Sequence, residues 1–383
     1  MKYLIYKVLN RTITDAELRE LQKWLEDSQN QITLENYIRD NYDINLSQSK
    51  ANIDEAFAGV IKRIEETSMP LKKIPLYKRS VFKYAAAAVI AILISLPLLI
   101  KNNTQKVNHE PIIVNNTIKK GTDKATLTLE DGTDITLVKD QSYVTDNIKS
   151  DGTKIIYEKT NSVKTEIAYN YLTVPRGGQY YVKLSDGTKV WLNSESKLKY
   201  PTNFISGALR KVELIYGEAY FDVSPSSEHD GAKFSVITDN QELEVLGTEF
   251  NIKAYKYEAY IYSTLVEGKV NIVNGASSTS LSPNQQAIIK QNTSGIEVVN
   301  VDTFSAISWK EGIFSFEDMP LDKIMKVLAR WYDFNVIFVD PTLKDILFTG
   351  ILRKNQSIKE ILEIIRTINN ITYEINNDTI IFR

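Results

Sequence analysis

The feature that most constrains this chain is an uncharged apolar segment, "YAAAAVIAILISLPLLI", from Tyr84 to Ile100. A helix of this length rises about 25 Å, and residues 81–83 extend it to roughly the 30 Å of a bilayer's hydrocarbon core. A buried core helix normally has a polar stripe, and this segment has none. About eighty residues precede it, which disfavours a cleaved signal peptide. We therefore predict one transmembrane helix at residues 81–101, with membrane positions Tyr84, Ile90, Leu96 and Ile100.

The charges that flank this segment predict its orientation. The N-terminal side carries Lys72, Lys73, Lys78, Arg79 and Lys83, whereas the other side has Lys101 and Lys106. Because positive residues collect on the cytoplasmic side, the N-terminus is predicted to face the cytoplasm. The expected localisation is the inner (cytoplasmic) membrane, as a single-pass protein with a periplasmic C-terminal region.

Residues 1–78 carry the pattern of a small all-α bundle. Thr14-x-x-Glu17 is a capping box at the start of a stripe that contains Leu18, Leu21, Trp24 and Leu25. A second helix is expected within residues 31–42, and "ANIDEAFAGVIKRIEE" supplies another, with Phe57 and Ile61 on its apolar face. So short a bundle buries little apolar surface. Its stripes either pack only on each other or are completed by a partner.

A polar connector is expected at residues 102–119, followed by an all-β domain at 120–300. Three segments, "LTLEDGTDITL", "IKSDGTKIIY" and "VKLSDGTKVWL", each place Asp-Gly between alternating runs. Asp-Gly favours a tight hairpin because glycine accepts a positive φ. Short strands at this spacing are typical of sandwiches, barrels and β-solenoids, and the domain is predicted to be solenoid- or sandwich-like.

The turn Arg176, Gly177, Gly178 in "TVPRGGQYYVKLSDGTKVWLNSESKLKYPTNF" raises the question of catalysis. It lacks the spacing of a Walker loop and the strand, G-x-G-x-x-G and helix of a dinucleotide site. No pair of carboxylates stands out for hydrolysis. The two histidines, His109 and His229, lie in polar loops, and the chain has no cysteine. The sequence therefore predicts no enzyme, no cofactor and no metal site.

The charge balance is close to even, with 46 Lys and Arg against 48 Asp and Glu. No global basic field therefore argues for direct nucleic acid binding. Partners must be sought in local features.

Residues 311–383 are predicted to form a separate α+β domain. A strand precedes Pro320, where a helix with Leu321, Ile324, Leu328 and Trp331 on its inner face begins. A second helix starts at the capping box Ser357-x-x-Glu360, and the chain ends in a hairpin at Asn377-Asp378. The predicted order is βαββαββ. The chain is thus expected to be multidomain, with an all-α bundle, one transmembrane helix, an all-β domain and this α+β domain.

Residues 174 to about 290 resemble the periplasmic domain of FecR-type transmembrane anti-sigma factors. The resemblance rests on "VPRGGQYYVKLSDGTKVWLNSESKLKYPTNF", "VELIYGEAYFDV", "VLGTEFNIKAY" and "TLVEGKVNI", in that order. "ELQKWLEDSQN" and "AFAGVIKRI" are similar to the family's cytoplasmic region. The last eighty residues resemble the C-terminal domain of Bacteroidota-type members, which is similar in layout to the short N-terminal domains of secretins and TonB-dependent transducers.

The resemblance implies two partners. These are an extracytoplasmic-function sigma factor and the signalling domain of a TonB-dependent outer-membrane transporter. We expect the sigma factor to contact Leu18, Leu21, Trp24, Leu25, Phe57 and Ile61. We expect the signal to be received near Arg176, Gly177, Gly178, Asp186, Gly187 and Trp331. Some members of the family cleave their own chain at a Gly-Thr bond, and the matching step here is Gly247-Thr248.

Two other readings remain open from the residues alone. A membrane-anchored periplasmic glycan-binding protein is suggested by 21 Tyr and 4 Trp, although alternating strands use the same residues as core. A membrane-anchored hydrolase lacks a catalytic set. The sequence does not identify the sigma factor, the transporter, the inducing nutrient or the oligomeric state.

Overall fold

The computed structural model describes residues 112–114, 116–158, 167–239, 241–369 and 371–383, with isolated positions between 19 and 30. The chain divides into two compact units. The first includes Met1–Arg39 and Lys50–Pro111, and the second includes Ile112–Arg383. Every strand of the described residues belongs to the second unit.

The described positions of the first unit lie on the predicted Leu18–Leu25 stripe. Residues 19, 21, 23 and 24 are helical, and the Leu25 amide donates to the Leu21 carbonyl at 3.0 Å. Leu21 and Leu25 are buried, whereas Trp24 is half-buried. On this stripe, Leu21 and Leu25 are therefore buried, and part of the Trp24 indole remains accessible.

The fold class predicted from the sequence is wrong for the chain as the structure describes it. The described residues are mostly β-strand, they contain no all-α bundle, and no helix among them is long and apolar enough to cross a membrane. The predicted bundle at 1–78 and helix at 81–101, with Tyr84, Ile90, Leu96 and Ile100, lie outside the described residues apart from the positions named above. The predicted bundle and transmembrane helix rest on apolar helical periodicity and on the length of one apolar segment, whereas period-two alternation governs much of the described sequence.

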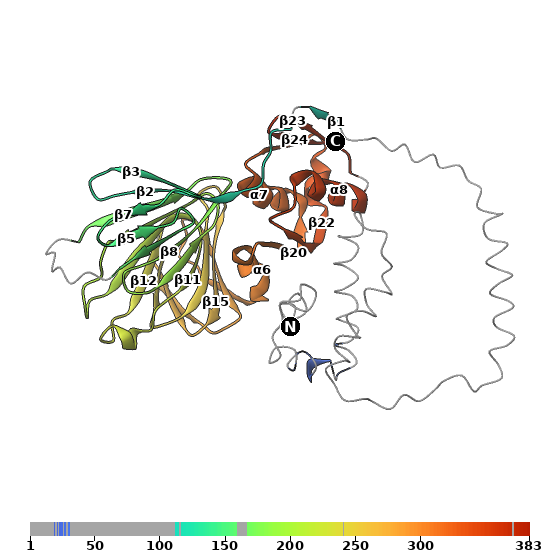
Figure 1. Ribbon diagram of the computed structural model, residues 1–383. Coiled ribbons are helices and arrows are strands. Elements are labelled where there is room, and N and C mark those ends of the chain that lie inside the picture. Colours follow the sequence, from blue (N-terminus) through green and yellow to red (C-terminus); the bar gives the residue numbers. More distant parts are fainter. Residues whose placement is uncertain are drawn as a thin grey trace, which may run out of the picture. The chain divides into compact units, whose positions relative to one another are not determined.

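The strands from β2 to β19 form one 18-stranded sheet that folds into two layers, the β sandwich. The first layer runs in spatial order through β3 (Asp134–Val138), β2 (Thr122–Thr128), β7 (Tyr169–Val174), β10 (Ser196–Pro201), the first half of β11 (Arg210–Asp222), β12 (Phe234–Thr238), β13 (Gln241–Val245), β16 (Val270–Asn274) and β17 (Ser277–Leu281). The second runs through β4 (Tyr143–Val144), β5 (Ile148–Ser150), β6 (Lys154–Tyr157), β8 (Gly178–Lys183), β9 (Lys189–Leu192), the second half of β11, β14 (Glu249–Ala254), β15 (Tyr260–Glu267), β18 (Gln285–Lys290) and β19 (Glu297–Asn300). Figure 1 shows these strands side by side.

Strand β11 joins the two layers. Its first half pairs with β10 and β12, and its second half, from Gly217 onward, pairs with β9 and β14. Gly217 has φ of 102°, and an added Cβ would lie 2.2 Å from the Ser196 hydroxyl. Only glycine permits this change of layer. Inward residues such as Leu198, Phe221 and Phe250 then share a single core between the layers.

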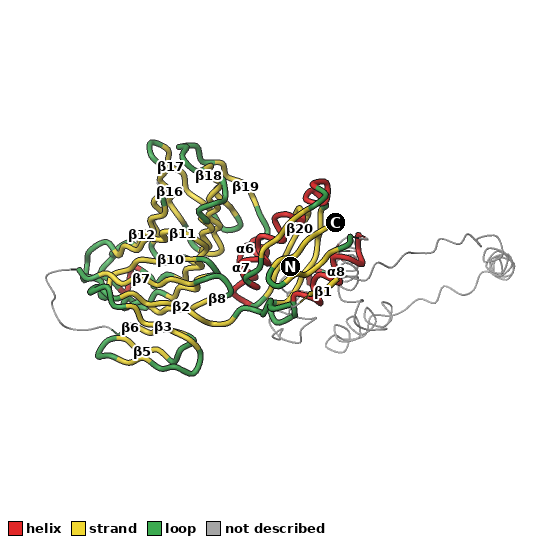
Figure 2. Tube along the Cα trace, turned by 90° about the horizontal axis from the view of Figure 1, so that it is seen from above, coloured by secondary structure: helices red, strands yellow, loops and turns green. Residues whose placement is uncertain are grey.

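The sandwich is followed by a C-terminal module, here residues 313–383, which is reached through α6 (Thr303–Ile307) and the 3₁₀ helix η2 (Ser308–Glu311). Its elements are β20 (Ile313–Pro320), α7 (Leu321–Tyr332), β21 (Asn335–Phe338), η3 (Pro341–Asp345), β22 (Leu347–Arg353), α8 (Ile358–Asn369), β23 (Tyr373–Asn376) and β24 (Thr379–Phe382). Strands and long helices therefore follow the order βαββαββ, as the sequence predicts. Figure 2 shows α6, α7 and α8 grouped with β20 at one end of the strand-rich region.

The capping signals of the module act as expected. The Ser357 amide donates to the Glu360 carboxylate at 2.6 Å, and the Glu360 amide donates to the Ser357 hydroxyl at 3.3 Å, which completes the capping box of α8. Helix α7 begins directly after Pro320 and ends at Tyr332, and its C-cap Asp333 has φ of 51°. The apolar faces of both helices pack into a second core, separate from that of the sandwich.

A strand from the start of the second unit completes the module's sheet. β1 (Ile112–Val114) pairs in parallel with β23, which gives the order β1-β23-β24-β21. This strand lies within the segment predicted as a connector. Ile118 packs against the module's core, so residues before the sandwich already belong to the module. The module thus contains both ends of the stretch Ile112–Arg383.

Candidate functional site

The Arg176–Gly178 turn between β7 and β8 lies against the C-terminal end of α7. Gly177 has φ of 66°, which favours glycine, and its amide donates to the Arg330 carbonyl at 2.7 Å. The turn is therefore bonded through its own backbone to a helix more than 150 residues away. We call this contact the junction, and it consists of Arg176, Gly177, Arg330, Trp331 and Asp333.

The Arg176 guanidinium closes the open end of α7. It donates to the Asp333 carboxylate at 2.9 Å, to the Ala329 carbonyl at 2.9 Å and to the Phe334 carbonyl. The last carbonyls of a helix have no partner within the helix, and the helix dipole favours a cation there. Arg176 thus caps a helix of the module from a turn of the sandwich.

Trp331 is buried where the chain enters the sandwich. Its indole Nε1 donates to the Lys354 carbonyl at 3.1 Å. A Cβ added to Gly121 would lie 2.6 Å from the indole ring, so the backbone at Gly121 packs directly on this ring. The structure therefore brings Trp331 together with the Arg176–Gly178 turn, as two parts of one contact.

Arg330 supplies the electrostatic part of the junction. Its guanidinium pairs with Glu258, lies 3.5 Å from a Glu195 oxygen and stands 3.6 Å above the Tyr255 ring. Burial opposes ionisation of Glu258, but Lys253 and Arg330 outweigh it and hold the pKa of that carboxyl below its usual value. Burial also raises the pKa of Tyr255 well above 10.0, so this phenol stays neutral.

Lys354 is a buried cation next to the junction. Its side chain is only 4% exposed, and its ammonium lies over the rings of Trp331, Trp309 and Phe314 at 4.4, 5.4 and 5.8 Å. It donates to the Gln179 side-chain oxygen at 3.1 Å and forms no ion pair in the described part of the chain. Burial lowers the pKa of Lys354 to about 7, and the more distant carboxylates of Glu218 and Asp123 offset this only in part.

A polar network continues from Lys354 into the sandwich. Glu218 accepts from the Asn193 amide at 2.8 Å and from the Asn251 amide at 3.0 Å. Asn251 in turn accepts from the Trp309 indole at 3.2 Å. The Trp309 bond therefore ties η2 to a hydrogen-bonded network within the sandwich.

The Asp186-Gly187 hairpin does not belong to this site. Asp186 pairs with Arg210 at 2.9 Å, and both side chains are 1% exposed. Arg210 also donates to the Ser224 and Ala232 carbonyls. Gly187 makes the tight turn at φ of 90°. The structure places this pair inside the sandwich as a packing element.

The residues considered for covalent chemistry have ordinary partners. The Thr248 hydroxyl donates to the Lys269 carbonyl at 3.1 Å, and Gly247 is not among the residues with a positive φ. His229 shares a hydrogen bond of 2.8 Å with the Ser224 hydroxyl. No group of three His, Cys, Asp or Glu in the described residues could hold a metal ion.

The predicted sigma-factor contacts are only partly described. Leu21, Trp24 and Leu25 lie on the helical stripe described above, and Leu18, Phe57 and Ile61 lie outside the described residues. Sequence reasoning missed Arg330, Glu258 and Lys354. Arg330 directly precedes the predicted Trp331, but no local pattern distinguishes Glu258 or Lys354 from surface charges.

Similarity to known proteins supports this division of the second unit. Residues 170–271 match the family described as "FecR protein", and residues 313–382 match "FecR, C-terminal". Two crystal structures of a "putative anti-sigma factor" from Parabacteroides distasonis ATCC 8503, at 1.65 and 2.50 Å resolution, are each 30% identical, with a TM-score of 0.50. Each match covers 56% of this chain and 98% of the other.

The chain belongs to the FecR family of anti-sigma factors. No curated protein matches it. The two FecR matches meet at the junction, because the first contains Arg176 and the second contains all of α7.

Proposed function

We propose that this anti-sigma factor binds an extracytoplasmic-function sigma factor through its N-terminal region. We further propose that its second unit receives a signal from the signalling domain of a TonB-dependent outer-membrane transporter. The role is regulatory and involves no catalysis. The observation that carries the proposal is the junction, which links the two FecR-matching parts by directional contacts.

The junction supports a relay because it resists independent motion of its two sides. Arg176 and the Gly177 amide fix the end of α7, and Arg330 is held by two carboxylates of the sandwich. A partner that binds the module and favours one arrangement of α7 must also favour one arrangement of the sandwich turn. A loosely tethered module would transmit no such preference.

The proposed compartments follow from this role. The N-terminal region lies in the cytoplasm with the sigma factor, and the second unit lies in the periplasm at the inner membrane. Reporter enzymes that work only outside the cytoplasm are expected to be active when fused after residue 383 and inactive when fused after residue 70. The opposite pattern contradicts this localisation.

For the sigma factor, the structure guides the choice of variant. Leu21 is fully buried, so replacing it disturbs the helix itself, whereas half-buried Trp24 has an accessible surface. Trp24→Glu in the full chain is expected to release the sigma factor in a pull-down and to raise expression of its regulon without inducer. Lys23→Glu on the same helix is the matched control, since residue 23 is exposed. If Trp24→Glu retains the sigma factor as well as the wild type does, Trp24 is not part of the sigma-factor contact.

The transporter contact is tested by calorimetry with its purified signalling domain. The full chain is expected to bind, and a chain that ends at residue 311 is expected to bind much more weakly, because it lacks the module. The exposed substitution Lys344→Ala serves as the control for nonspecific charge effects. If the full and the truncated chain bind the signalling domain with equal affinity, the receiving surface lies on the sandwich and not on the module.

A further inference from the structure

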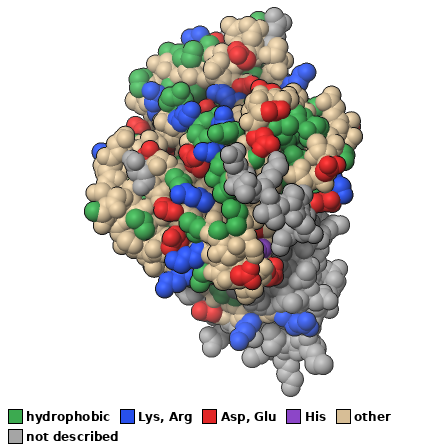
Figure 3. All heavy atoms as spheres, turned by 90° about the vertical axis from the view of Figure 1, so that its left-hand side faces the viewer, with side chains coloured by type: hydrophobic (Ala, Val, Ile, Leu, Met, Phe, Trp, Pro, Cys, Tyr) green, Lys and Arg blue, Asp and Glu red, His purple; other side chains and the backbone are tan. Residues whose placement is uncertain are grey.

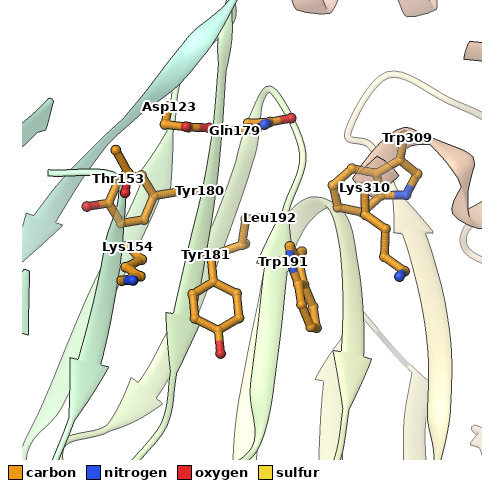
Figure 4. Close-up of a pocket in the computed structure, with 10 residues that line it drawn as sticks. All are labelled: Asp123, Thr153, Lys154, Gln179, Tyr180, Tyr181, Trp191, Leu192, Trp309 and Lys310. Atoms are coloured by element: carbon orange, nitrogen blue, oxygen red, sulfur yellow. Dashed lines mark hydrogen bonds between the residues drawn. The ribbon is translucent and has the colours of Figure 1, made fainter. Parts of the chain in front are cut away.

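A cavity of about 270 Å³ opens on the outer face of the second layer of the sandwich, beside η2. Residues of β2, β6, β8, β9 and η2 line it (Figure 4). It is separate from the junction contacts of Arg176 and Arg330 and has no place in the proposed relay. Its volume is just below the range of typical ligand pockets, which begins at about 300 Å³.

Two aromatic side chains of the cavity wall, Tyr181 and Trp191, belong to a row of rings set by strand register. Tyr181 on β8 lies opposite Trp191 on β9, which lies opposite Tyr220 on β11. The Tyr181 and Trp191 ring centroids are 5.0 Å apart, and those of Trp191 and Tyr220 are 5.7 Å apart. Tyr181 and Trp191 are half-buried, so both rings keep accessible surface towards the cavity. Trp309 of η2 lines the cavity at the end beyond Trp191, as Figure 4 shows.

Polar groups surround the aromatic row. Asp123 and Gln179 form a pair of planar side chains, with the Gln179 amide donating to Asp123 at 3.0 Å. Thr153 and Lys154 line the cavity beside Tyr181, and Lys310 lies over Trp191 and Tyr220. A ligand here meets hydrogen-bonding groups around its edge and apolar rings on its face.

The charges disfavour an anionic ligand. Lys154 is paired with Asp151 at 3.5 Å and Lys310 with Glu311 at 2.6 Å. Asp123, in contrast, forms no ion pair within the described residues and would oppose a carboxylate or phosphate. On the face of the molecule shown in Figure 3, basic and acidic side chains are interspersed.

We propose that this cavity binds a neutral saccharide. The C–H face of a sugar ring is apolar and suits Tyr181 and Trp191, whereas its edge carries hydroxyls that the Asp123–Gln179 pair and Thr153 can bond. Gln179 also accepts from Lys354, so an occupied cavity lies one side chain away from the buried cation.

The test uses the indole N–H resonances of the full chain, which has four tryptophans. Trp191→Phe identifies the Trp191 signal by its loss. Cellobiose, maltose and chitobiose are titrated separately, with glucuronate as the acidic comparison. We expect at least one disaccharide to shift the Trp191 signal with a Kd on the order of 1 mM, because few contacts are made. The signals of Trp24 and Trp331 are expected to stay in place.

Tyr181→Ala should weaken this binding at least about tenfold, since it removes one ring of the face. Tyr262→Ala is the matched control, because Tyr262 is a half-buried tyrosine of the same layer outside the cavity. The proposal is overturned if no disaccharide moves the Trp191 signal, if glucuronate binds best, or if both tyrosine variants bind alike. None of these outcomes bears on the sigma factor or the transporter.

Discussion

Two turns that lie ten residues apart along β7–β9 illustrate how differently similar sequence signals are used. Both the Arg176–Gly178 turn and the Asp186-Gly187 hairpin contain a glycine with a positive φ beside a charged residue. The hairpin turns inward, and Asp186 is sealed against Arg210 within the sandwich. The other turn points to the module, where Arg176 remains 36% exposed and caps α7.

The difference shows that turn chemistry predicts where the chain bends but not what the bend contacts. Gly187 closes its hairpin with a local bond from its amide to the Leu184 carbonyl at 2.9 Å. Gly177 instead gives its amide to Arg330, far along the chain. A local bond maintains a fold, whereas a distant one links two parts of it.

The largest effect is expected at the closed hairpin. Asp186→Ala leaves the Arg210 guanidinium buried without its carboxylate, which should lower the free energy of unfolding by about 3–5 kcal/mol. Urea denaturation of the full chain measures this loss. Asp151→Ala is the control, because Asp151 forms the corresponding exposed turn and its loss should cost below about 1 kcal/mol. Similar losses for the two variants would contradict the distinction between buried and exposed turns.

Lys354 differs from Arg210 in its partners. Both side chains are buried, but Lys354 lies beside the junction without the carboxylate that Arg210 has. Its pKa is about 7 in the fold and near 10.5 in the unfolded chain, so between these values the unfolded state binds more protons. The free energy of unfolding should therefore rise with pH across this range, by up to about 1.4 kcal/mol per pH unit. Below pH 7 both states are protonated and this contribution to the slope disappears.

Urea denaturation at several pH values above 7 measures that slope. Lys354→Met keeps most of the side-chain volume and removes the charge, so it should flatten the dependence. Lys344→Met, at an exposed position, should leave it unchanged. An equal slope in wild type and Lys354→Met would show that this lysine is already charged in the fold.

A smaller effect is expected at the open turn. Arg176→Ala removes bonds to the Asp333 carboxylate and two carbonyls, at a partly exposed position, and should cost about 1–3 kcal/mol. In cells it should weaken the response to inducer while the protein level stays constant. Lys183→Ala, on the adjacent strand β8, is the control for loss of a surface charge. A full response to inducer in the Arg176 variant would show that the junction is not needed to transmit the signal.

The sequence predicts the local parts of this structure well. Asp-Gly turns, the capping box at Ser357 and the order of the module's elements depend on residues close together in the chain. It does not predict that Arg176 meets Asp333, that β1 pairs with β23, or that Lys354 is buried. Those features are set by contacts between segments that no period or motif connects.

The most direct test of the account is amide hydrogen exchange at Gly177 and Gly187 in the full chain. Both amides are expected to be protected in the wild type, since each donates a backbone hydrogen bond. In Arg176→Ala, exchange at Gly177 should accelerate about tenfold or more, because its partner lies across the junction, and exchange at Gly187 should remain unchanged. Unchanged exchange at Gly177 in this variant, or equal acceleration at both amides, would contradict the claim that Arg176 holds the sandwich turn to the C-terminal module.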